Sequence, residues 1–171
     1  VEGAVGDWSA LYLFEDKGIV IQEAVMGVML FNGTMCIGRL LGNTIGKHVT
    51  SKQVVVGGYL LGAIAMALIV FLPGHASMYT YLLLGISLAM VVPNLFSAMG
   101  EQNVIPMTQA VATSTMLGYM GILMGPALIG FIAHGTSLTI AFIVLTVLLV
   151  ISAGIGKYAY YLMNKNCGVE E

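Results

Sequence analysis

Charged residues are scarce in this sequence. Lysine and arginine together number 6, aspartate and glutamate number 8, and the four types account for 8% of the 171 residues. A soluble domain carries about 25% of such residues, because its surface has to be solvated. The deficit excludes a water-soluble domain of this length. It also leaves no basic patch of the kind that binds nucleic acid.

Cysteine is nearly absent, and the groups of residues that mark metal or catalytic sites are missing. Cys36 lies in an apolar stretch and Cys167 in a polar one, so we expect two unpaired thiols rather than a disulfide bond. No spacing of His, Cys, Asp or Glu indicates a metal, and no Ser-His-Asp set, HExxH motif or phosphate loop occurs. We therefore predict no metal, no cofactor and no enzymatic activity.

The sequence consists largely of long hydrophobic runs, and hydrophobic residues make up 58% of it. A helix needs roughly 20 apolar residues to cross the ~30 Å hydrocarbon core of a bilayer. We expect membrane spans at 1–14 (partial), 24–41, 54–72, 78–99, 110–133 and 138–156, followed by a polar tail over 157–171. The runs are continuous rather than alternating, which excludes β-barrel strands. The predicted fold class is all-α integral membrane, with six transmembrane helices.

The first of these runs is too short to cross a bilayer. The chain opens with Val-Glu-Gly, without a methionine or the basic start of a signal peptide. We therefore expect a chain truncated at its N-terminus, in which 1–14 is the second half of a span.

The basic residues predict the orientation of these spans. Arg39, Lys47 and Lys52 lie between the second and third spans, and Lys157 and Lys165 follow the sixth. An even number of spans separates the two groups, so they share one side of the membrane. Loops rich in lysine and arginine face the cytoplasm. We expect the loop 43–53 and the C-terminus on that side.

Three stretches of the chain resemble the major facilitator superfamily. Gly38, Leu41, Gly42, Gly46 and Lys47 resemble its loop signature, which is a glycine, Leu-Gly-Asp, and a glycine followed by basic residues. The fifth run is similar to the glycine-proline pattern of the fifth and eleventh helices of that family, through Gly118, Tyr119, Gly121, Gly125, Pro126 and Gly130. The opening Glu2-Gly3-Ala4 and Asp7-Trp8-Ser9-Ala10-Leu11-Tyr12 resemble the seventh helix of a bacterial branch often called YbjJ-like.

The resemblance implies that residues 1–171 are helices seven to twelve, the C-terminal half of a twelve-helix secondary carrier in a bacterial inner membrane. It implies alternating access, with a small-molecule solute held between two halves near mid-membrane. The expected partners are the lipid bilayer, the N-terminal half of the same carrier, the solute and protons. Asn43 departs from the family, which usually has Asp there. An amide cannot form the ion pair of a carboxylate, so this departure favours a packing role for the loop.

Two acids lie inside the first span. Counting back from Phe14 at 1.5 Å per residue places Glu2 roughly 18 Å from the wet end of the helix and Asp7 roughly 10 Å from it. An ionisable residue at depth costs roughly 2.5–3.5 kcal/mol on insertion scales, so it needs a partner, a cavity or a proton. A proton-carrying role and a structural ion pair stay open for both. At 100° per residue Glu2 and Ser9 share a helix face, and Asp7 points about 140° away.

Further polar residues are candidates for the solute and proton pathway. Asn94 follows Pro93, which cannot donate to the carbonyl of Ala89, and such broken helices form transporter sites. A kink with an interhelical hydrogen bond explains the pair as well. The predicted pathway residues are Glu2, Asp7, Trp8, Ser9, Asn32, Asn94, Ser97 and Tyr119. Trp8 has an alternative role in helix packing.

Small residues and prolines predict moving contacts. We expect a gating loop made of Gly38, Arg39, Gly42, Asn43, Gly46 and Lys47. We expect packing or hinge positions at Pro93, Gly118, Gly121, Gly125 and Pro126. For both sets, close helix packing is the simpler alternative.

The function predicted from the sequence is therefore secondary active transport of a small solute by alternating access, coupled to protons. A drug or metabolite efflux carrier is one alternative. A receptor or scaffold of the same fold that no longer transports is another.

Overall fold

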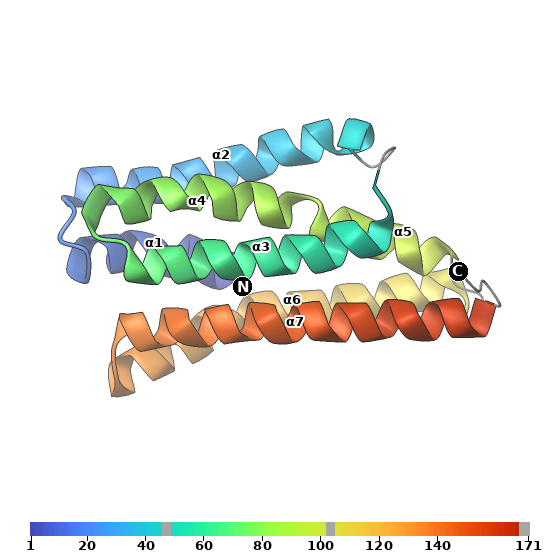
Figure 1. Cartoon of the computed structure of the whole chain (residues 1–171). Helices are drawn as coiled ribbons and strands as arrows, with labels where there is room; N and C mark the ends of the chain where they lie inside the picture. The colour runs from blue at the N-terminus through green and yellow to red at the C-terminus, as the bar shows by residue number, and fades with distance from the viewer. Residues whose placement is uncertain (46–48, 102–104, 168–171) are drawn as a thin grey trace.

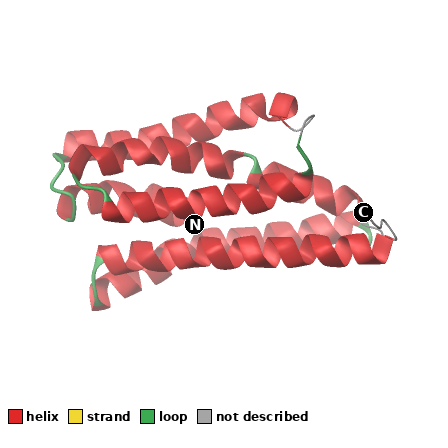
Figure 2. Ribbon diagram, viewed as in Figure 1, coloured by secondary structure: helices red, strands yellow, loops and turns green. Residues whose placement is uncertain are grey.

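The computed structural model describes residues 1–45, 49–101 and 105–167 (Figure 1). Every regular element in these ranges is a helix (Figure 2). The helices are α1 (Glu2–Glu15), α2 (Ile21–Ile45), α3 (Ser51–Phe71), α4 (Gly74–Ala89), α5 (Val91–Glu101), α6 (Met107–Gly135) and α7 (Leu138–Cys167). The predicted all-α fold class is confirmed.

Five helical stretches are long and apolar enough to cross a membrane. They are Ile21–Gly42, Ser51–Phe71, Gly74–Gly100, Met107–Gly135 and Leu138–Met163. Helices α4 and α5 together form one of them. Helix α1 has 14 residues and is therefore about 21 Å long, which is too short to span alone. The molecule is a multi-pass membrane protein.

Helices α2 and α7 extend beyond the apolar runs from which the corresponding spans are predicted. Helix α2 continues to Ile45, and α7 continues to Cys167, through residues expected as a polar tail. The stretch after Gly156 contains no proline or glycine up to Cys167, and alanine, leucine, methionine and lysine favour helix. A polar residue at the end of a run marks the edge of the hydrocarbon, whereas the helix itself ends only where its backbone is interrupted.

The spans close into a ring. Helix α1 contacts α2, α2 contacts α4, α4 contacts α3, α3 contacts α7, α7 contacts α6, and α6 returns to α1. Figure 1 shows the end of α2, the start of α3 and the end of α7 at one end of this bundle. The short links α1–α2, α3–α4 and α6–α7 lie at the other end.

The core fills the ring at the end where the short links lie. Its largest fully buried side chains include Tyr12, Phe31, Tyr81 and Phe142, which come from α1, α2, α4 and α7. The rings of Tyr12 and Phe142 stack with centroids 4.2 Å apart. Such an aromatic pair stabilises by about 0.5–1.5 kcal/mol beyond the burial of its area. The second half of α1 is therefore anchored in the core of the bundle.

The side chain of Lys17 connects the α1–α2 link to the end of α3 by hydrogen bonds. Lys17 Nζ donates to the carbonyl oxygens of Val70 at 2.6 Å and Leu72 at 2.9 Å. These carbonyls belong to the last turn of α3 and its cap, where a positive charge is favourable. Burial lowers the pKa of Lys17, and the nearby Asp16 carboxylate opposes that shift. Gly18 follows with φ +68°, a left-handed conformation that favours glycine.

The fourth span is interrupted in its middle. Helix α4 ends at Ala89 and α5 begins at Val91, with Met90 between them. Pro93 has no N–H, so the Ala89 carbonyl loses its usual helical donor. The backbone N–H of Asn94 donates to the Met90 carbonyl at 3.2 Å, and its side-chain Nδ2 donates to the same oxygen at 2.8 Å. The break turns α5 toward α3 and α6, both of which it contacts.

Candidate solute and ion pathway

The first turn of α1 and the last part of α2 meet in an ion pair. A guanidinium nitrogen of Arg39 lies 3.5 Å from Oε2 of Glu2. The two side chains are 46% and 38% exposed, so both remain accessible from a cavity. Arg39 was expected in a loop. Because α2 continues to Ile45, Arg39 lies inside the helix and reaches the acid on α1.

This pairing could have been anticipated from the sequence. Helices α1 and α2 contact each other and are joined by a short link. Glu2 lies roughly 20 Å before the end of α1, and Arg39 roughly 27 Å after the start of α2, at 1.5 Å per residue. In an antiparallel hairpin these positions have similar depth, and the long arginine side chain spans the difference.

The ion pair lies in a cavity of about 430 Å³ inside the ring. Every described span contributes to its wall. Besides Glu2 and Arg39, its polar side chains are Tyr59 and Ser152, and the rest is apolar or glycine. Val1, the first residue of the sequence, is also part of the lining. The volume of the cavity is measured within the described part of the chain. A cavity with one compensated pair of charges can hold a polar solute or water where a fully apolar core cannot.

A second cavity of about 410 Å³ adjoins the first between α5 and α6. The two share Val92, Gly118 and Ile122. The remaining lining consists of Leu95, Phe96, Met99, Ser114, Thr115 and Tyr119. No residue of this lining is charged, so it suits the apolar part of a ligand, with hydroxyl groups available for hydrogen bonds.

Glu2 and Tyr119 are the predicted pathway residues that line these cavities. Three others donate hydrogen bonds to a backbone carbonyl four residues earlier in the chain. Asn32 Nδ2 donates to the Val28 carbonyl at 3.0 Å, and Ser97 Oγ donates to the Pro93 carbonyl at 3.2 Å. Asn94 bonds to Met90 as described above. The polar side chain of such a residue thus donates its hydrogen bond to a backbone carbonyl of the preceding turn and needs no other partner. The periodicity of the sequence does not reveal this arrangement.

The three remaining candidates on α1 have different surroundings. Trp8 Nε1 donates to the Pro126 carbonyl at 3.0 Å, which joins α1 to α6. A Cβ at Gly130 would lie 2.8 Å from the Trp8 ring, so the indole packs directly on α6. Ser9 is fully buried, and its hydroxyl has no hydrogen-bond partner among the described residues. Asp7 is exposed.

The described part of the predicted gating loop is a packing surface. A Cβ at Gly38 would lie 2.6 Å from the Ala89 Cβ, and one at Gly42 would collide with the Met90 side chain. Both glycines therefore let α2 approach α4 closely. Asn43 lies in α2, but its side chain, and the whole of Gly46 and Lys47, fall outside the described residues.

The predicted packing stripe on α6 has a different environment. A Cβ placed at Gly118, Gly121 or Gly125 would meet no other atom of the described chain within 4 Å. Pro126 lies inside α6, where its carbonyl accepts the Trp8 N–H. The stripe is therefore not a helix contact within the described part of the chain, and its Gly118 and Gly121 border the cavity that holds the ion pair.

Comparison with known proteins gives relatives by sequence. No family model and no solved structure matches the chain. A protein named an uncharacterized MFS-type transporter, from Yersinia pestis, is 41% identical over 142 residues, which are 82% of this chain and 37% of that protein. This chain is a homologue of MFS-type transporters. The predicted resemblance to the major facilitator superfamily is thereby confirmed.

Two more distant relatives agree with it. The membrane protein MosC of Rhizobium meliloti is 29% identical over 80% of this chain and 34% of its own length. The uncharacterized transporter y4wD of Sinorhizobium fredii is 28% identical over 84% of this chain and 38% of its own length. The chain thus spans somewhat more than a third of the curated relatives it matches, which is consistent with the C-terminal half of an MFS-type transporter.

Proposed function

We propose that this chain forms one half of a secondary carrier that moves a small solute across a membrane by alternating access, with proton coupling through Glu2. The observation that carries the proposal is the Glu2–Arg39 ion pair inside a cavity. The names of the relatives support transport in general terms.

The chemistry of coupling follows from charge compensation. A lone ionised group within the hydrocarbon region costs roughly 2.5–3.5 kcal/mol, whereas a close pair of opposite charges compensates itself. When Glu2 takes up a proton, Arg39 loses its counter-charge and requires another anion. A solute with a carboxylate or similar acidic group supplies it. The proton on Glu2 and the solute anion on Arg39 thus stabilise the same state, in which the ion pair is broken. Binding of either one alone leaves one of the two groups without a partner and is less favourable.

The second cavity supports a solute with an apolar portion. Phe96 and Tyr119 offer aromatic surface, and Ser114 and Thr115 offer hydroxyl groups, directly beside the charged cavity. We therefore propose a small organic anion with an apolar or aromatic part as the solute class. The gradients of the solute and of the proton set the direction of net transport.

The proposed orientation is that of a bacterial inner-membrane protein with the loop 43–53 and the C-terminus in the cytoplasm. The start of α3, whose first turn contains Lys52, and the end of α7, whose last turn contains Lys165, lie at the end of the bundle where α2 ends (Figure 1). That gathering supports the sidedness that the distribution of basic residues predicts.

The test uses the full-length carrier in proteoliposomes with a pH-sensitive dye inside. Sugars, organic acids and cationic drugs are added in turn. We expect proton flux with organic acids, and we expect Glu2→Gln to abolish the flux while solute binding is retained. Glu15→Gln, an exposed acid at the other end of α1, is the matched control and should behave as wild type. Flux unchanged in Glu2→Gln would refute the coupling role. A folded carrier that moves no solute would favour a receptor or scaffold.

A further inference from the structure

Gly118 on α6 lies where the two pathway cavities meet. It is one of three residues that line both cavities, and the other two are the branched residues Val92 and Ile122. A Cβ placed at Gly118 would meet no atom of the described chain within 4 Å. The space beside this glycine is therefore open, and any larger side chain would occupy the junction of the two cavities.

The neighbours of Gly118 on the same face of α6 belong to different cavities. Ser114, about one turn before it, lines the second cavity and not the first. Gly121, about one turn after it, lines the cavity of the ion pair and not the second. Residues three or four apart lie on one helix face, roughly 5–6 Å apart along the axis. Gly118 thus lies between the two cavities on that face.

The two cavities offer different groups to a ligand. The first contains the Glu2–Arg39 ion pair, and the second has Phe96 and Tyr119 in a lining without a charged residue. An organic acid whose carboxylate pairs with Arg39 and whose apolar part lies beside Phe96 has to extend past Gly118. A shorter acid fits in the first cavity alone.

We propose that Gly118 determines how long a solute the carrier accepts. The hydrogen atom of a glycine leaves the junction wide enough for the apolar part of an organic acid. A methyl or isopropyl group at this position fills the junction and excludes long acids, whereas acids that occupy only the first cavity still bind. The inference rests on the proposed transport of organic anions and assigns their size selection to one residue.

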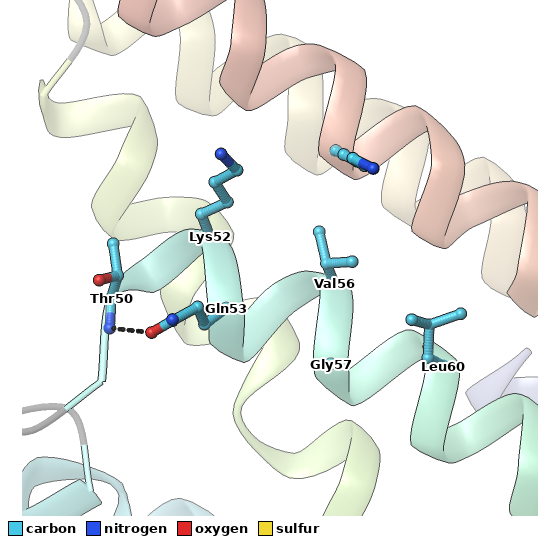
Figure 3. A pocket seen from close by; sticks show the side chains of 7 residues that line it. Thr50, Lys52, Gln53, Val56, Gly57 and Leu60 are labelled. Atoms are coloured by element: carbon cyan, nitrogen blue, oxygen red, sulfur yellow. Dashed lines mark hydrogen bonds between the residues drawn. The ribbon is translucent and has the colours of Figure 1, made fainter. Parts of the chain in front are cut away.

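Gly57 on α3 provides a matched control. It lines a third cavity of about 550 Å³, between the start of α3 and the second half of α7 (Figure 3). That cavity shares no lining residue with the other two. A Cβ at Gly57 would also meet no atom of the described chain within 4 Å. The same substitution at Gly57 and Gly118 therefore replaces a helical glycine beside open space, but only Gly118 borders the pathway.

The test compares two acids that differ by one phenyl ring, lactate and 3-phenyllactate. Uptake of each radiolabelled acid by the full-length carrier is measured in proteoliposomes, and uptake by protein-free vesicles is subtracted. We expect the wild type to move both acids. Gly118→Val should lower Vmax/KM for phenyllactate relative to lactate at least tenfold, because one carbon too many in a pocket changes discrimination by about 10–200-fold. Gly118→Ala should lie between the valine variant and wild type.

The ratio of the two acids separates size selection from a structural defect. Lactate uptake by the same vesicles reports the folded carrier, so a poorly folding variant lowers both rates and leaves the ratio unchanged. Gly57→Val should keep the ratio of wild type, and so should Gly125→Val, which changes a glycine of α6 outside both cavities. An unchanged ratio in Gly118→Val and Gly118→Ala, or exclusion of phenyllactate by the wild type, would overturn the role of Gly118 alone. A folded wild-type carrier that moves neither acid would overturn the proposed function as well.

Discussion

Glu2 and Arg39 illustrate how single residues acquire a role through their neighbours. Either group alone is costly in a hydrocarbon environment, and each is brought within 3.5 Å of the other by the antiparallel arrangement of α1 and α2. Both side chains remain more than a third exposed, so water from the cavity weakens their attraction. A pair of this kind can open and reform, whereas a fully desolvated pair is fixed.

A double-mutant cycle of Glu2→Gln and Arg39→Gln tests this pair in the full-length carrier. We expect a coupling free energy of about 0.5–1 kcal/mol in chemical unfolding, because the groups attract each other across a partly solvated cavity. The coupling should decrease at high salt. Glu15→Gln combined with Arg39→Gln should show none. A coupling above about 3 kcal/mol would mean that the pair is buried, and zero coupling that it does not form.

At the scale of elements, glycines set how closely α2 and α4 pack. Gly38 and Gly42 on α2 lie against Ala89 and Met90, and Gly85 on α4 lies against the backbone of Phe31. In a bilayer the lipid tails are as apolar as the side chains, so the hydrophobic effect does not favour contacts between helices over contacts with lipid. Van der Waals contact between closely packed backbones supplies the attraction instead. These glycines therefore hold two spans together.

Gly38→Ala should lower the free energy of unfolding of the full-length carrier by about 1–3 kcal/mol, because its Cβ would collide with that of Ala89. The measurement is thermal or chemical unfolding in detergent. Gly33→Ala is the matched control on the same helix, where a Cβ meets no atom within 4 Å. It should be neutral, or stabilising by up to about 1 kcal/mol through helix propensity. Equal effects of both variants would contradict the packing role of Gly38.

At the scale of the whole molecule, α6 is the candidate span that the rest of the described chain buries least. Only 6% of its apolar window is buried within the described chain, against 28–44% for the other spans. The glycines of its predicted packing stripe are Gly118 and Gly121, which line the cavity of the ion pair, and Gly125, which lines neither pathway cavity. A helix that faced only lipid would gain nothing from glycines, which weaken it by about 1 kcal/mol each relative to alanine. The N-terminal half of the proposed carrier, packed against this helix, accounts for a glycine such as Gly125.

Gly125→Leu should therefore reduce transport by the full-length carrier at least tenfold, because the new side chain would separate the two halves and Gly125 lines neither of the two pathway cavities. Gly154→Leu on α7 is the control, since a Cβ there also meets no atom and that residue is exposed. Its transport should stay close to wild type. Uptake or efflux in the proteoliposome assay, normalised to folded protein, is the measurement. Unimpaired transport by Gly125→Leu would place this part of the stripe against lipid.

Membrane spans were predictable because their signal is local. The hydrocarbon core demands a continuous apolar stretch in each helix, whatever its neighbours are. The ends of α2 and α7 were less predictable, since Arg39 and Lys157 look like loop residues although the helix continues through them. Of the predicted pathway residues, Glu2 and Tyr119 line cavities, whereas Asn32 and Ser97 form hydrogen bonds on their own helices.

The sequence by itself determined the membrane location, the all-helical class and the resemblance to a carrier family, because composition, run length and motif spacing are properties of the chain alone. Only the tertiary structure decided that Glu2 meets Arg39, that Trp8 packs on α6, and that Gly38 packs against Ala89 while Gly121 borders a cavity. These outcomes depend on the rotation of each helix about its axis and on the order of the helices around the ring. Both are set by contacts between residues far apart in the chain.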